Sequence, residues 1–385
     1  MSKLERLIQQ YCPDGVEWKP LGEATIMKRG TSATKGIMQE GDIPVISGGR
    51  QPAFYCNVSN RTGEVITVAG SGAGAGYVQY WNEPIFVCDA FSIQGNETLK
   101  TKYVYYILTN IQEKIYSTKK GGGVPHVHIS SIDKFEIPVP PLPVQEEIVR
   151  ILDAFTELQA ELQAELQKRK QQYNYYLDNL LNFKNINRGG YQAEVRWMKL
   201  KDIGKVCMCK RILKSQTSSS GDVPFFKIGT FGGNADAYIS QALFNEYKAK
   251  YSYPQKGEVL ISAAGTIGRT IVFDGTPSYF QDSNIVWLKH DESIVLNSYL
   301  RYCYALNPWV VSTGGTIARL YNDNILEATI PVPSLANQQR IVSILDRFDT
   351  LTTDLTQGLP AEIEKRRQQY EYYRDKLLTF KRKGA

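Results

Sequence analysis

The feature that most constrains this chain is an internal repeat. Residues 137–155 read IPVPPLPVQEEIVRILDAF and residues 330–348 read IPVPSLANQQRIVSILDRF, with twelve of the nineteen positions identical. A second matched pair, residues 169–184 and 366–381, is identical at eleven of sixteen positions. Self-similarity at a fixed spacing is typical of a duplicated structural unit. We therefore expect two copies of one unit, each a variable half followed by a well-matched segment.

The two well-matched segments have the pattern of long amphipathic helices. Apolar residues recur at three- and four-residue steps from Ile148 to Leu180 and from Ile341 to Leu377. Prolines just before each segment exclude an earlier helix start. The offset between the copies grows from 193 to 197 residues, so the second copy has four additional residues, around 357–360. Four residues are close to one helical turn and nearly keep the same face, but the Gly-Leu-Pro sequence there predicts a kink or a bend.

The apolar faces of these helices need a partner, and the other copy is the obvious one. This predicts a pair of antiparallel coiled-coil helices related by a pseudo-two-fold axis. The alternative is that each helix packs only on its own half. The repeated Gln-Gln-Tyr-x-Tyr-Tyr stripe fits the core of the helix pair, with one tyrosine of each three outward, and it also fits a partner-binding surface, where Tyr is enriched. The residues expected in the helix pair or at a partner are Phe155, Leu162, Tyr173, Tyr176, Phe348, Leu355, Tyr370 and Tyr373.

The variable halves have a different pattern, with short strands and many loops. β-Branched and aromatic runs bounded by Gly, Pro, Asn or Asp predict strands at 64–70, 77–81, 85–93, 258–265, 270–273 and 285–289. Residues 102–116 and 297–311 have the spacing of short helices. The predicted fold class is therefore α+β. The expected domains are a first head (1–142), a first spacer helix (143–184), a second head (185–336) and a second spacer helix (337–385).

Composition excludes several classes of protein. The chain is 42% hydrophobic and 22% charged, which is typical of a folded protein and not of a disordered one. The first twenty residues contain no apolar signal region, and no window approaches eighteen consecutive apolar residues. The six cysteines are too scattered for a disulfide framework or a zinc site. We expect a cytoplasmic protein without a membrane span or a metal centre.

Motifs of catalysis are missing from the sequence. A translocase would need G-x-x-x-x-G-K-S/T, and an adenine methyltransferase resembling known families would need Asn/Asp-Pro-Pro-aromatic, for which the nearest string is Asn307-Pro308-Trp309. The glycine-rich stretch 70–76 is followed by a strand pattern and not by a helix, so it favours a hairpin or a close approach to DNA over a nucleotide site. His126 and His128 alternate as on a strand and are expected in a loop, facing solvent or DNA.

Charge alone does not decide between nucleic acid and other ligands. The formal net charge is +6, and the first head holds 14 Lys/Arg against 13 Asp/Glu, a net of +1. If DNA is the ligand, its phosphates and base edges call for Lys, Arg, amide or His side chains in loops. In the first head the candidates are Lys28, Arg29, Lys35, Arg50, Arg61, Lys119, Lys120 and His126. In the second head they are Lys210, Arg211, Lys214, Lys227, Arg269, Arg319, Asn322 and Asn324.

The sequence resembles the DNA specificity subunit of type I restriction–modification systems. The resemblance covers nearly the whole chain and is carried by CPDGVEWKPLGE (12–23), VRWMKLKDIG (195–204) and the paired proline–glutamine–helix segments. It implies that the heads are target recognition domains, each reading one half of a split, asymmetric DNA site. It also implies that the helices set the gap between half-sites and dock two modification (methyltransferase) subunits, and through them the restriction subunits.

The same resemblance implies a non-catalytic chain without a cofactor of its own. S-adenosylmethionine and ATP with Mg²⁺ are then expected on the partner subunits only. A two-headed coiled-coil adaptor that binds protein or carbohydrate remains the alternative, because the first head is nearly neutral. A self-contained methyltransferase or nuclease conflicts with the missing motifs.

Overall fold

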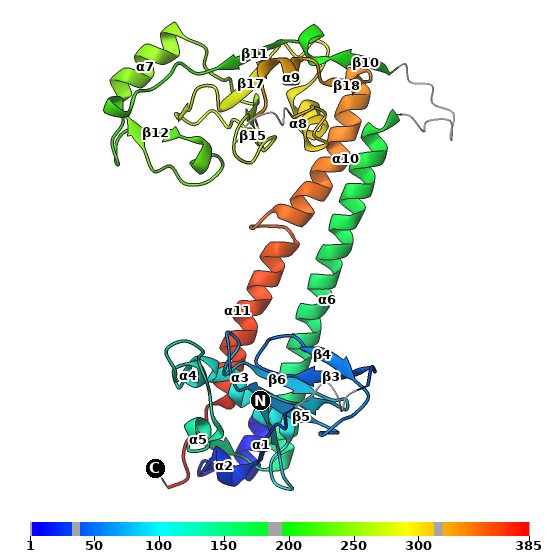
Figure 1. The fold of residues 1–385 in the computed structure, drawn as a ribbon, viewed down its shortest axis with the longest axis vertical. Coiled ribbons are helices and arrows are strands. Elements are labelled where there is room, and N and C mark those ends of the chain that lie inside the picture. Colours follow the sequence, from blue (N-terminus) through cyan, green and yellow to red (C-terminus); the bar gives the residue numbers. More distant parts are fainter. Residues whose placement is uncertain (1, 33–38, 184–194, 312–318, 385) are drawn as a thin grey trace. The chain divides into compact units, whose positions relative to one another are not determined.

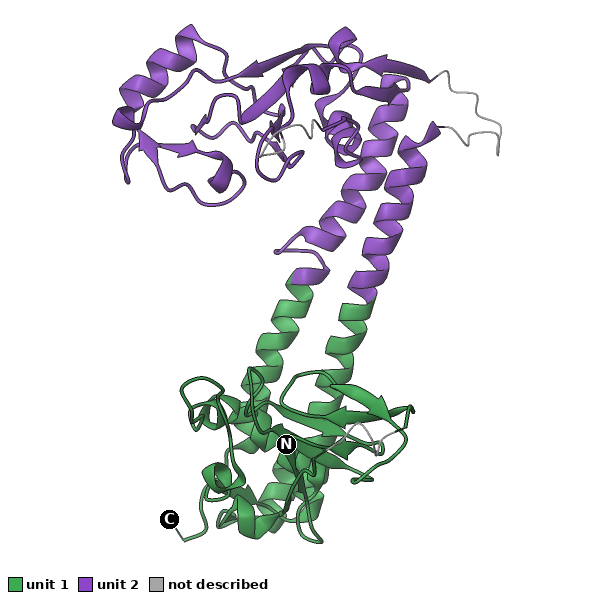
Figure 2. Ribbon diagram, viewed as in Figure 1, with its two compact units in different colours: residues 1–164, 361–385 green, residues 165–360 purple. Residues whose placement is uncertain are grey.

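The computed structural model describes residues 2–32, 39–183, 195–311 and 319–384. The chain divides into two compact units (Figure 2). Unit 1 comprises residues 1–164 and 361–385, and unit 2 comprises residues 165–360. Each unit therefore contains one head together with helix from both well-matched segments. No helix in the described ranges is long and apolar enough to cross a membrane.

The described residues of the first head form three small sheets, some of whose strands are labelled in Figure 1. A four-stranded antiparallel sheet has the order β2 (Ile26–Arg29), β8 (Ala90–Gln94), β5 (Val65–Ala69), β6 (Val78–Trp81). A three-stranded sheet has the order β4 (Phe54–Cys56), β3 (Ile43–Ile46), β7 (Phe86–Val87), in which β3 and β7 are parallel. A ribbon pairs β1 (Glu17–Pro20) with β9 (Glu136–Val139). The helices are α1 (Lys3–Tyr11), α2 (Leu21–Ala24), α3 (Thr101–Asn110), α4 (Gln112–Tyr116) and α5 (Ile129–Ile132).

The second head repeats this topology strand for strand. Its four-stranded sheet has the order β11 (Lys205–Met208), β17 (Ile285–Lys289), β14 (Val259–Ser262), β15 (Thr270–Val272). Its three-stranded sheet has the order β13 (Tyr238–Ile239), β12 (Val223–Phe226), β16 (Tyr279–Phe280), and its ribbon pairs β10 (Arg196–Lys199) with β18 (Thr329–Val332). The helices are α7 (Gln241–Lys250), α8 (Asn297–Ala305) and α9 (Asn322–Leu326), with short 3₁₀ turns η2 (Leu200–Asp202), η3 (Lys214–Gln216) and η4 (Ile228–Thr230). The matching strand orders confirm the predicted duplication and the α+β class.

The predicted elements of the heads are present, and the largest differences in their bounds fall in three places. The expected strand 85–93 is divided into β7 and β8. The expected helix 102–116 is divided into α3 and α4, and the expected helix 297–311 ends at Ala305. The predicted boundary at 184/185 lies outside the described residues.

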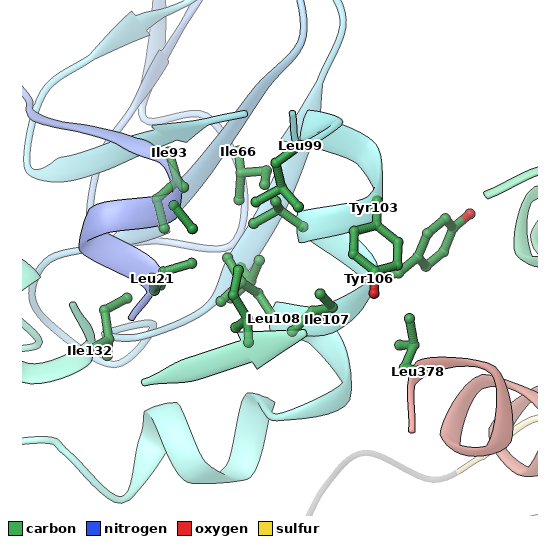
Figure 3. Packing of buried hydrophobic residues seen from close by; sticks show 14 of the residues in the cluster. Leu21, Ile66, Ile93, Leu99, Tyr103, Tyr106, Ile107, Leu108, Ile132 and Leu378 are labelled. Carbon is green, nitrogen blue, oxygen red and sulfur yellow. The ribbon is translucent and has the colours of Figure 1, made fainter. Parts of the chain in front are cut away.

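The core of the first head lies between its four-stranded sheet and α3. All five residues of β5 are buried, and α3 packs across β5, β6 and β8. Figure 3 shows Ile66 and Ile93 of the sheet facing this core, with Tyr103 and Leu108 of α3. Leu378, from the far end of the chain, belongs to the same buried cluster. The second well-matched segment therefore completes the core of the first head.

The first well-matched segment is one 40-residue helix, α6 (Leu142–Leu181), whereas the second is divided into α10 (Leu335–Thr353) and α11 (Leu359–Leu378). The division falls at the four additional residues and confirms the interruption predicted there. The Asp354 carboxylate accepts a hydrogen bond from the Thr356 backbone N–H at 2.7 Å, which favours a turn over continued helix. A Cβ atom at Gly358 would lie 2.5 Å from the Thr350 carbonyl oxygen, so this close approach requires glycine.

Within each unit, α6 packs antiparallel to a helix of the second copy. In unit 1 the centroid of the Phe155 ring lies 5.6 Å from that of the Tyr373 ring. Ile148, which comes earlier in α6, belongs to the same buried cluster as Leu378, which comes later in α11. Later residues of α11 thus meet earlier residues of α6. In unit 2, Tyr176 stacks on Phe348 at 5.2 Å, and Leu181 and Ile341 share a buried cluster. These contacts support pairing between the copies over helices that pack only on their own halves.

One residue of the predicted apolar stripe does not lie in the helix pair. Leu355 falls in the turn between α10 and α11, and its side chain is 80% exposed. The prediction assumed continuous helical spacing through this position. The Asp354 turn breaks that spacing, so Leu355 is not a packing residue of the pair.

A buried glutamine joins each head to the helix that follows it. Gln145 is fully buried at the start of α6, where its carbonyl oxygen accepts from the Lys100 backbone N–H at 2.9 Å and its amide donates to the Thr98 and Pro140 carbonyls at 2.9 and 2.7 Å. Gln338 makes the same three bonds at 2.8–2.9 Å, with the Leu296 N–H and the Ile294 and Pro333 carbonyls. We call this contact the head–helix junction.

Two tyrosines extend each junction. Tyr103 donates to the Pro138 carbonyl, and its counterpart Tyr299 donates to the Pro331 carbonyl. The hydroxyl of Tyr106 donates to Asp153 of α6, and the hydroxyl of Tyr302 donates to Asp346 of α10. Burial is the main cause that raises the pKa of both Tyr106 and Tyr302, so both hydroxyls keep their protons and remain donors. The junction is therefore conserved between the copies at the level of single hydrogen bonds.

Candidate nucleic-acid interface

The second head has a polar surface pocket of about 840 Å³ that brings together four of the predicted residues. They are Arg211, Lys214, Lys227 and Arg319. Arg211 and Lys214 follow β11, Lys227 follows β12, and Arg319 precedes α9. Asp236 and Asp282 also line the pocket, which therefore holds both cationic donors and carboxylate acceptors.

Hydrogen bonds orient the cations of this pocket. The Arg211 Nε lies 2.8 Å from Asp282 Oδ2, and the Lys227 Nζ lies 2.8 Å from Asp236 Oδ1. The Arg319 Nη2 donates to the Ser283 carbonyl at 3.2 Å and to Asn284 Oδ1 at 3.3 Å. Arg211 nevertheless stays 68% exposed. The side chains that line this pocket can donate hydrogen bonds to phosphate oxygens, and they can both donate to and accept from base edges.

The first head has a smaller pocket, of about 180 Å³, in the corresponding place. Arg29, Asp89, His126 and His128 line it, so it contains two of the predicted residues, Arg29 and His126. The Asp89 carboxylate accepts a hydrogen bond from the Ser71 hydroxyl. The rings of His126 and His128 lie parallel, with centroids 6.0 Å apart.

The glycine-rich stretch 70–76 positions one wall of this pocket. It connects β5 to β6 as a hairpin, as predicted, and does not begin a helix. The Gly72 N–H donates to the Pro125 carbonyl at 3.0 Å, and Ser71 forms a β-bridge with His126. A Cβ atom at Gly74 would lie 2.4 Å from the Gly48 carbonyl oxygen. Small residues are needed here because three backbone segments meet, and this leaves the His126 side chain at the pocket.

The other predicted residues of the first head that the structure describes do not line this pocket. Lys28 is exposed on β2, and Lys119 lies 4.1 Å from the Tyr116 ring. Arg50 lies 4.9 Å from the Tyr77 ring, and the backbone of Lys120 exchanges two hydrogen bonds with His126. Lys35 lies outside the described residues.

Arg61 has a role inside the first head. Its guanidinium donates to the Ser92 hydroxyl at 2.7 Å and to the carbonyls of Asn60 and Arg29 at 2.7 and 2.8 Å. Burial lowers the pKa of this group. We assign Arg61 to the framework that holds β2 against β8, and a DNA contact of Arg61 stays a prediction.

Four predicted residues of the second head do not line its pocket, and two of these lie in helix α9. Lys210 lies 5.3 Å from the Tyr251 ring, and Arg269 donates to the Gly232 carbonyl at 3.2 Å. Asn322 and Asn324 lie in α9, where the Asn324 side chain accepts from the Tyr321 N–H at 3.0 Å. The prediction placed all candidates in loops, which is wrong for these two and for Lys28 and Arg29 of β2.

The prediction missed the carboxylates of both pockets. Asp89 lines the pocket of the first head and Asp282 that of the second. They are 193 residues apart, but the backbone counterpart of Asp89 is Asn284, because the Gly70 N–H pairs with the Asp89 carbonyl and the Ala263 N–H with the Asn284 carbonyl. The sequence prediction considered only cationic, amide and His side chains as contacts of an anionic ligand, so it did not include carboxylates. The described residues contain no group of three or more His, Cys, Asp or Glu side chains placed to hold a metal ion.

The tyrosine stripes divide between the helix pair and solvent. Tyr176 and Tyr373 stack on the phenylalanine of the other copy, although each remains about 42% exposed. Tyr175 is 65% exposed and Tyr372 is 62% exposed. Each stripe therefore presents at least one aromatic side chain to the surface.

Comparisons with known proteins agree with one another. The sequence profile of the type I restriction modification DNA specificity domain matches residues 13–171 and 192–365. A type I restriction enzyme specificity subunit of Haemophilus influenzae is 45% identical, with 98% of each chain covered. A type I restriction enzyme specificity subunit of Escherichia coli is 32% identical, covering 99% of this chain and 97% of the relative.

Solved structures share the fold at low sequence identity. The S subunit of a type I restriction–modification system from M. genitalium aligns with a TM-score of 0.60 at 17% identity, over 94% of this chain and 95% of that one. A chain from a structure of the type I restriction–modification system aligns with a TM-score of 0.57 at 19% identity, over 95% and 98%. With the profile matched twice and close relatives matched end to end, this chain belongs to the family of type I restriction–modification DNA specificity subunits.

Proposed function

We propose that each head reads one half of a split, asymmetric DNA site through its pocket. The observation that carries this proposal is that one framework occurs twice with different side chains in the equivalent pockets. A common framework lets both heads approach a duplex in the same way. Different pocket side chains then give each head a different base preference.

The helices are proposed to set the gap between the half-sites and to dock two methyltransferase subunits. The exposed aromatic rings of Tyr175 and Tyr372 support docking, because exposed tyrosines are enriched at the centres of protein interfaces. Restriction subunits would join through the methyltransferase subunits. The relatives are named as specificity subunits of such enzymes.

The chain itself is proposed to be non-catalytic. Its sequence lacks the nucleotide-binding and methyltransferase motifs named above. S-adenosylmethionine, ATP and Mg²⁺ would bind the partner subunits. The two-headed adaptor for protein or carbohydrate is not favoured by any of the matches described.

The experiment is a methylation map of a host without other adenine methylation, carrying the methyltransferase subunit with or without this chain. Single-molecule sequencing should show one split motif that depends on this chain. Arg211→Ala with Lys214→Ala should alter or abolish the half of the motif read by the second head. Lys256→Ala, at an exposed position of the second head that does not line the pocket, is the matched control and should leave the motif intact.

Two results would count against the proposal. The first is an unchanged methylation map when this chain is added. The second is binding of the purified complex to DNA that does not weaken with salt, because contacts to phosphates release counterions and depend steeply on salt.

A further inference from the structure

His126 and Arg319 occupy one backbone position in the two heads. They are 193 residues apart, as are the well-matched segments. His126 forms an antiparallel β-bridge with Ser71, and Arg319 forms one with Ala264. Ser71 and Ala264 are also 193 residues apart, so sequence and backbone pairing give the same equivalence.

The residue that follows each of them fixes this backbone. The Val127 N–H donates to the Gly70 carbonyl at 3.0 Å, and the Leu320 N–H donates to the Ala263 carbonyl at 2.9 Å. The Val127 and Leu320 side chains are 1% and 2% exposed. Because the main chain is held by these contacts, the side chain at position 126 or 319 can change without changing the fold of its head.

Both side chains line the pocket of their head together with the residue that precedes β8 or β17. His126 lies with Asp89, and Arg319 donates to its backbone counterpart Asn284, because the Gly70 N–H pairs with the Asp89 carbonyl and the Ala263 N–H with the Asn284 carbonyl. The two positions therefore share location and backbone support. They differ in the chemistry of the side chain itself.

A guanidinium and an imidazole suit different base edges. Arginine offers only donors, and guanine is the base whose major-groove edge presents two acceptors, N7 and O6. Contacts of Arg319 Nη2 with Ser283 and Asn284 restrict the plane of its guanidinium before any ligand arrives. A neutral imidazole carries one donor and one acceptor. The imidazole of His126 stacks on that of His128.

We propose that position 126/319 determines which base each head reads, with Arg319 selecting a guanine in the half-site of the second head. His126 then reads a different base in the half-site of the first head. This inference rests on the proposed function of the heads as readers of DNA, and it adds the residue and the base.

The test exchanges the two side chains and maps methylation in the same host. Arg319→His should reduce discrimination at one guanine of the second half-site by roughly tenfold or more, since a bidentate contact to guanine contributes that much. The first half-site and the gap should not change. His126→Arg should create a new preference for guanine in the first half-site. Arg319→Lys keeps the positive charge but loses the planar guanidinium with its parallel N–H donors, so it should also lower discrimination at this guanine.

Three results would overturn the inference. One is a motif unchanged in both exchange variants. Another is that Arg319→His weakens DNA binding equally on all sequences and lowers the number of counterions released on binding by about one. That result would identify a phosphate contact. The third is loss of the second half-site by Arg319→His together with a lowered melting temperature and no new preference in His126→Arg, which would identify a structural role. A wild-type complex without any split motif would instead contradict the proposed function itself.

Discussion

The two heads are most alike where they meet the helices and least alike where their pockets open. Gln145 and Gln338 make the same three hydrogen bonds, and paired tyrosines repeat the same contacts beside them. The pockets, in contrast, have volumes of about 180 and 840 Å³ and different side chains. A duplicated framework has thus retained its attachment and changed its surface, as expected when function depends on side chains placed on a common fold.

The three-stranded sheets provide a second difference between the heads. In the second head, α7 follows β13, and its Phe244 packs edge-on against Tyr253 in an aromatic cluster with Tyr279. In the first head the described residues between β4 and β5 contain no helix, and Phe54 and Tyr55 remain 43% and 56% exposed. The outer sheet of the second head therefore has a core of its own, whereas that of the first head has only small clusters.

The largest expected effect comes from breaking either head–helix junction. Gln145→Leu or Gln338→Leu would remove the partner of one N–H and two carbonyl groups, of which the Pro140 or Pro333 carbonyl lies in a buried bond and the other two groups in part-buried bonds. Unpaired buried groups cost about 1–3 kcal/mol each, so each variant should lose roughly 3–5 kcal/mol of unfolding free energy. Urea unfolding, with hydrogen exchange to assign the loss to unit 1 or unit 2, measures this. Gln163→Leu on the exposed face of α6 is the control, and a loss no larger than that of the control would refute the junction's importance.

The helix pair should be the next most sensitive region. Phe155→Ala removes contacts with Tyr370 and Tyr373, and Phe348→Ala removes the contact with Tyr176. Both phenylalanines are half-buried, so we expect a loss of about 2 kcal/mol, below the range for fully buried rings. Thermal unfolding of both variants tests whether the two units pair their helices with similar strength. A loss in only one unit would show that the pairing is unequal.

The tyrosine hydroxyls provide a finer comparison of the junctions. Tyr106→Phe and Tyr302→Phe each remove one hydrogen bond to a carboxylate but keep the ring, and each should cost about 1–2 kcal/mol. In both variants the aspartate still forms a salt bridge. Lys102 lies 2.8 Å from Asp153, and Arg301 lies 3.6 Å from Asp346. Equal losses in chemical denaturation would support equivalent junctions. A difference above about 1 kcal/mol would show that the closer cation compensates in the first head.

The smallest effect should be found at neutral pH and only in unit 1, and it should disappear in acid. Hydrogen bonds from Arg150, and then from Lys3, lower the pKa of the buried Glu147 carboxyl to about 2. Because this pKa is lower in the folded state, the stabilisation is complete above about pH 4.5 and is lost as the pH falls toward 2. Glu147→Gln should therefore cost roughly 1 kcal/mol or less at pH 7 and almost nothing at pH 2. Unfolding free energies measured across this range test it, and a constant difference would contradict the ion-pair explanation.

The second copy offers an internal control for this pH dependence. Arg340 occupies the position equivalent to Glu147, 193 residues later. The change in unfolding free energy caused by Arg340→Gln should stay the same between pH 4.5 and pH 2.

The framework could be predicted from the sequence because the repeat and the periodicity report backbone structure directly. The helix α6, the strands β5 and β14 and the glycine hairpin all follow from local pattern. The division of the second helical segment was also foreseeable, because four added residues included Gly358 and Pro360.

The roles of individual polar residues could not be predicted in this way. The sequence predicts Arg61 to be a loop arginine, but its guanidinium donates to the neighbouring Asn60 and to Ser92 and Arg29 of distant segments. Gln145 and Gln338 were visible as repeated letters, yet their contacts with residues more than 40 positions away depend on the packed head. Pattern shows which residues are repeated, while tertiary contacts decide whether a polar side chain faces a ligand or the protein.

Unit 1 is discontinuous in sequence, and this has a consequence for synthesis on the ribosome. Its core includes Leu378, and the Val16 N–H pairs with the Lys381 carbonyl at 2.8 Å. Domains commonly fold in the order in which they are translated. Here residues 361–385 leave the ribosome after all of unit 2. The first head is therefore synthesised early but lacks this part of its core until the end of translation. A nascent chain would expose the apolar surface of α3 and the first half of α6 throughout translation of unit 2, and we expect chaperones to bind there during that interval.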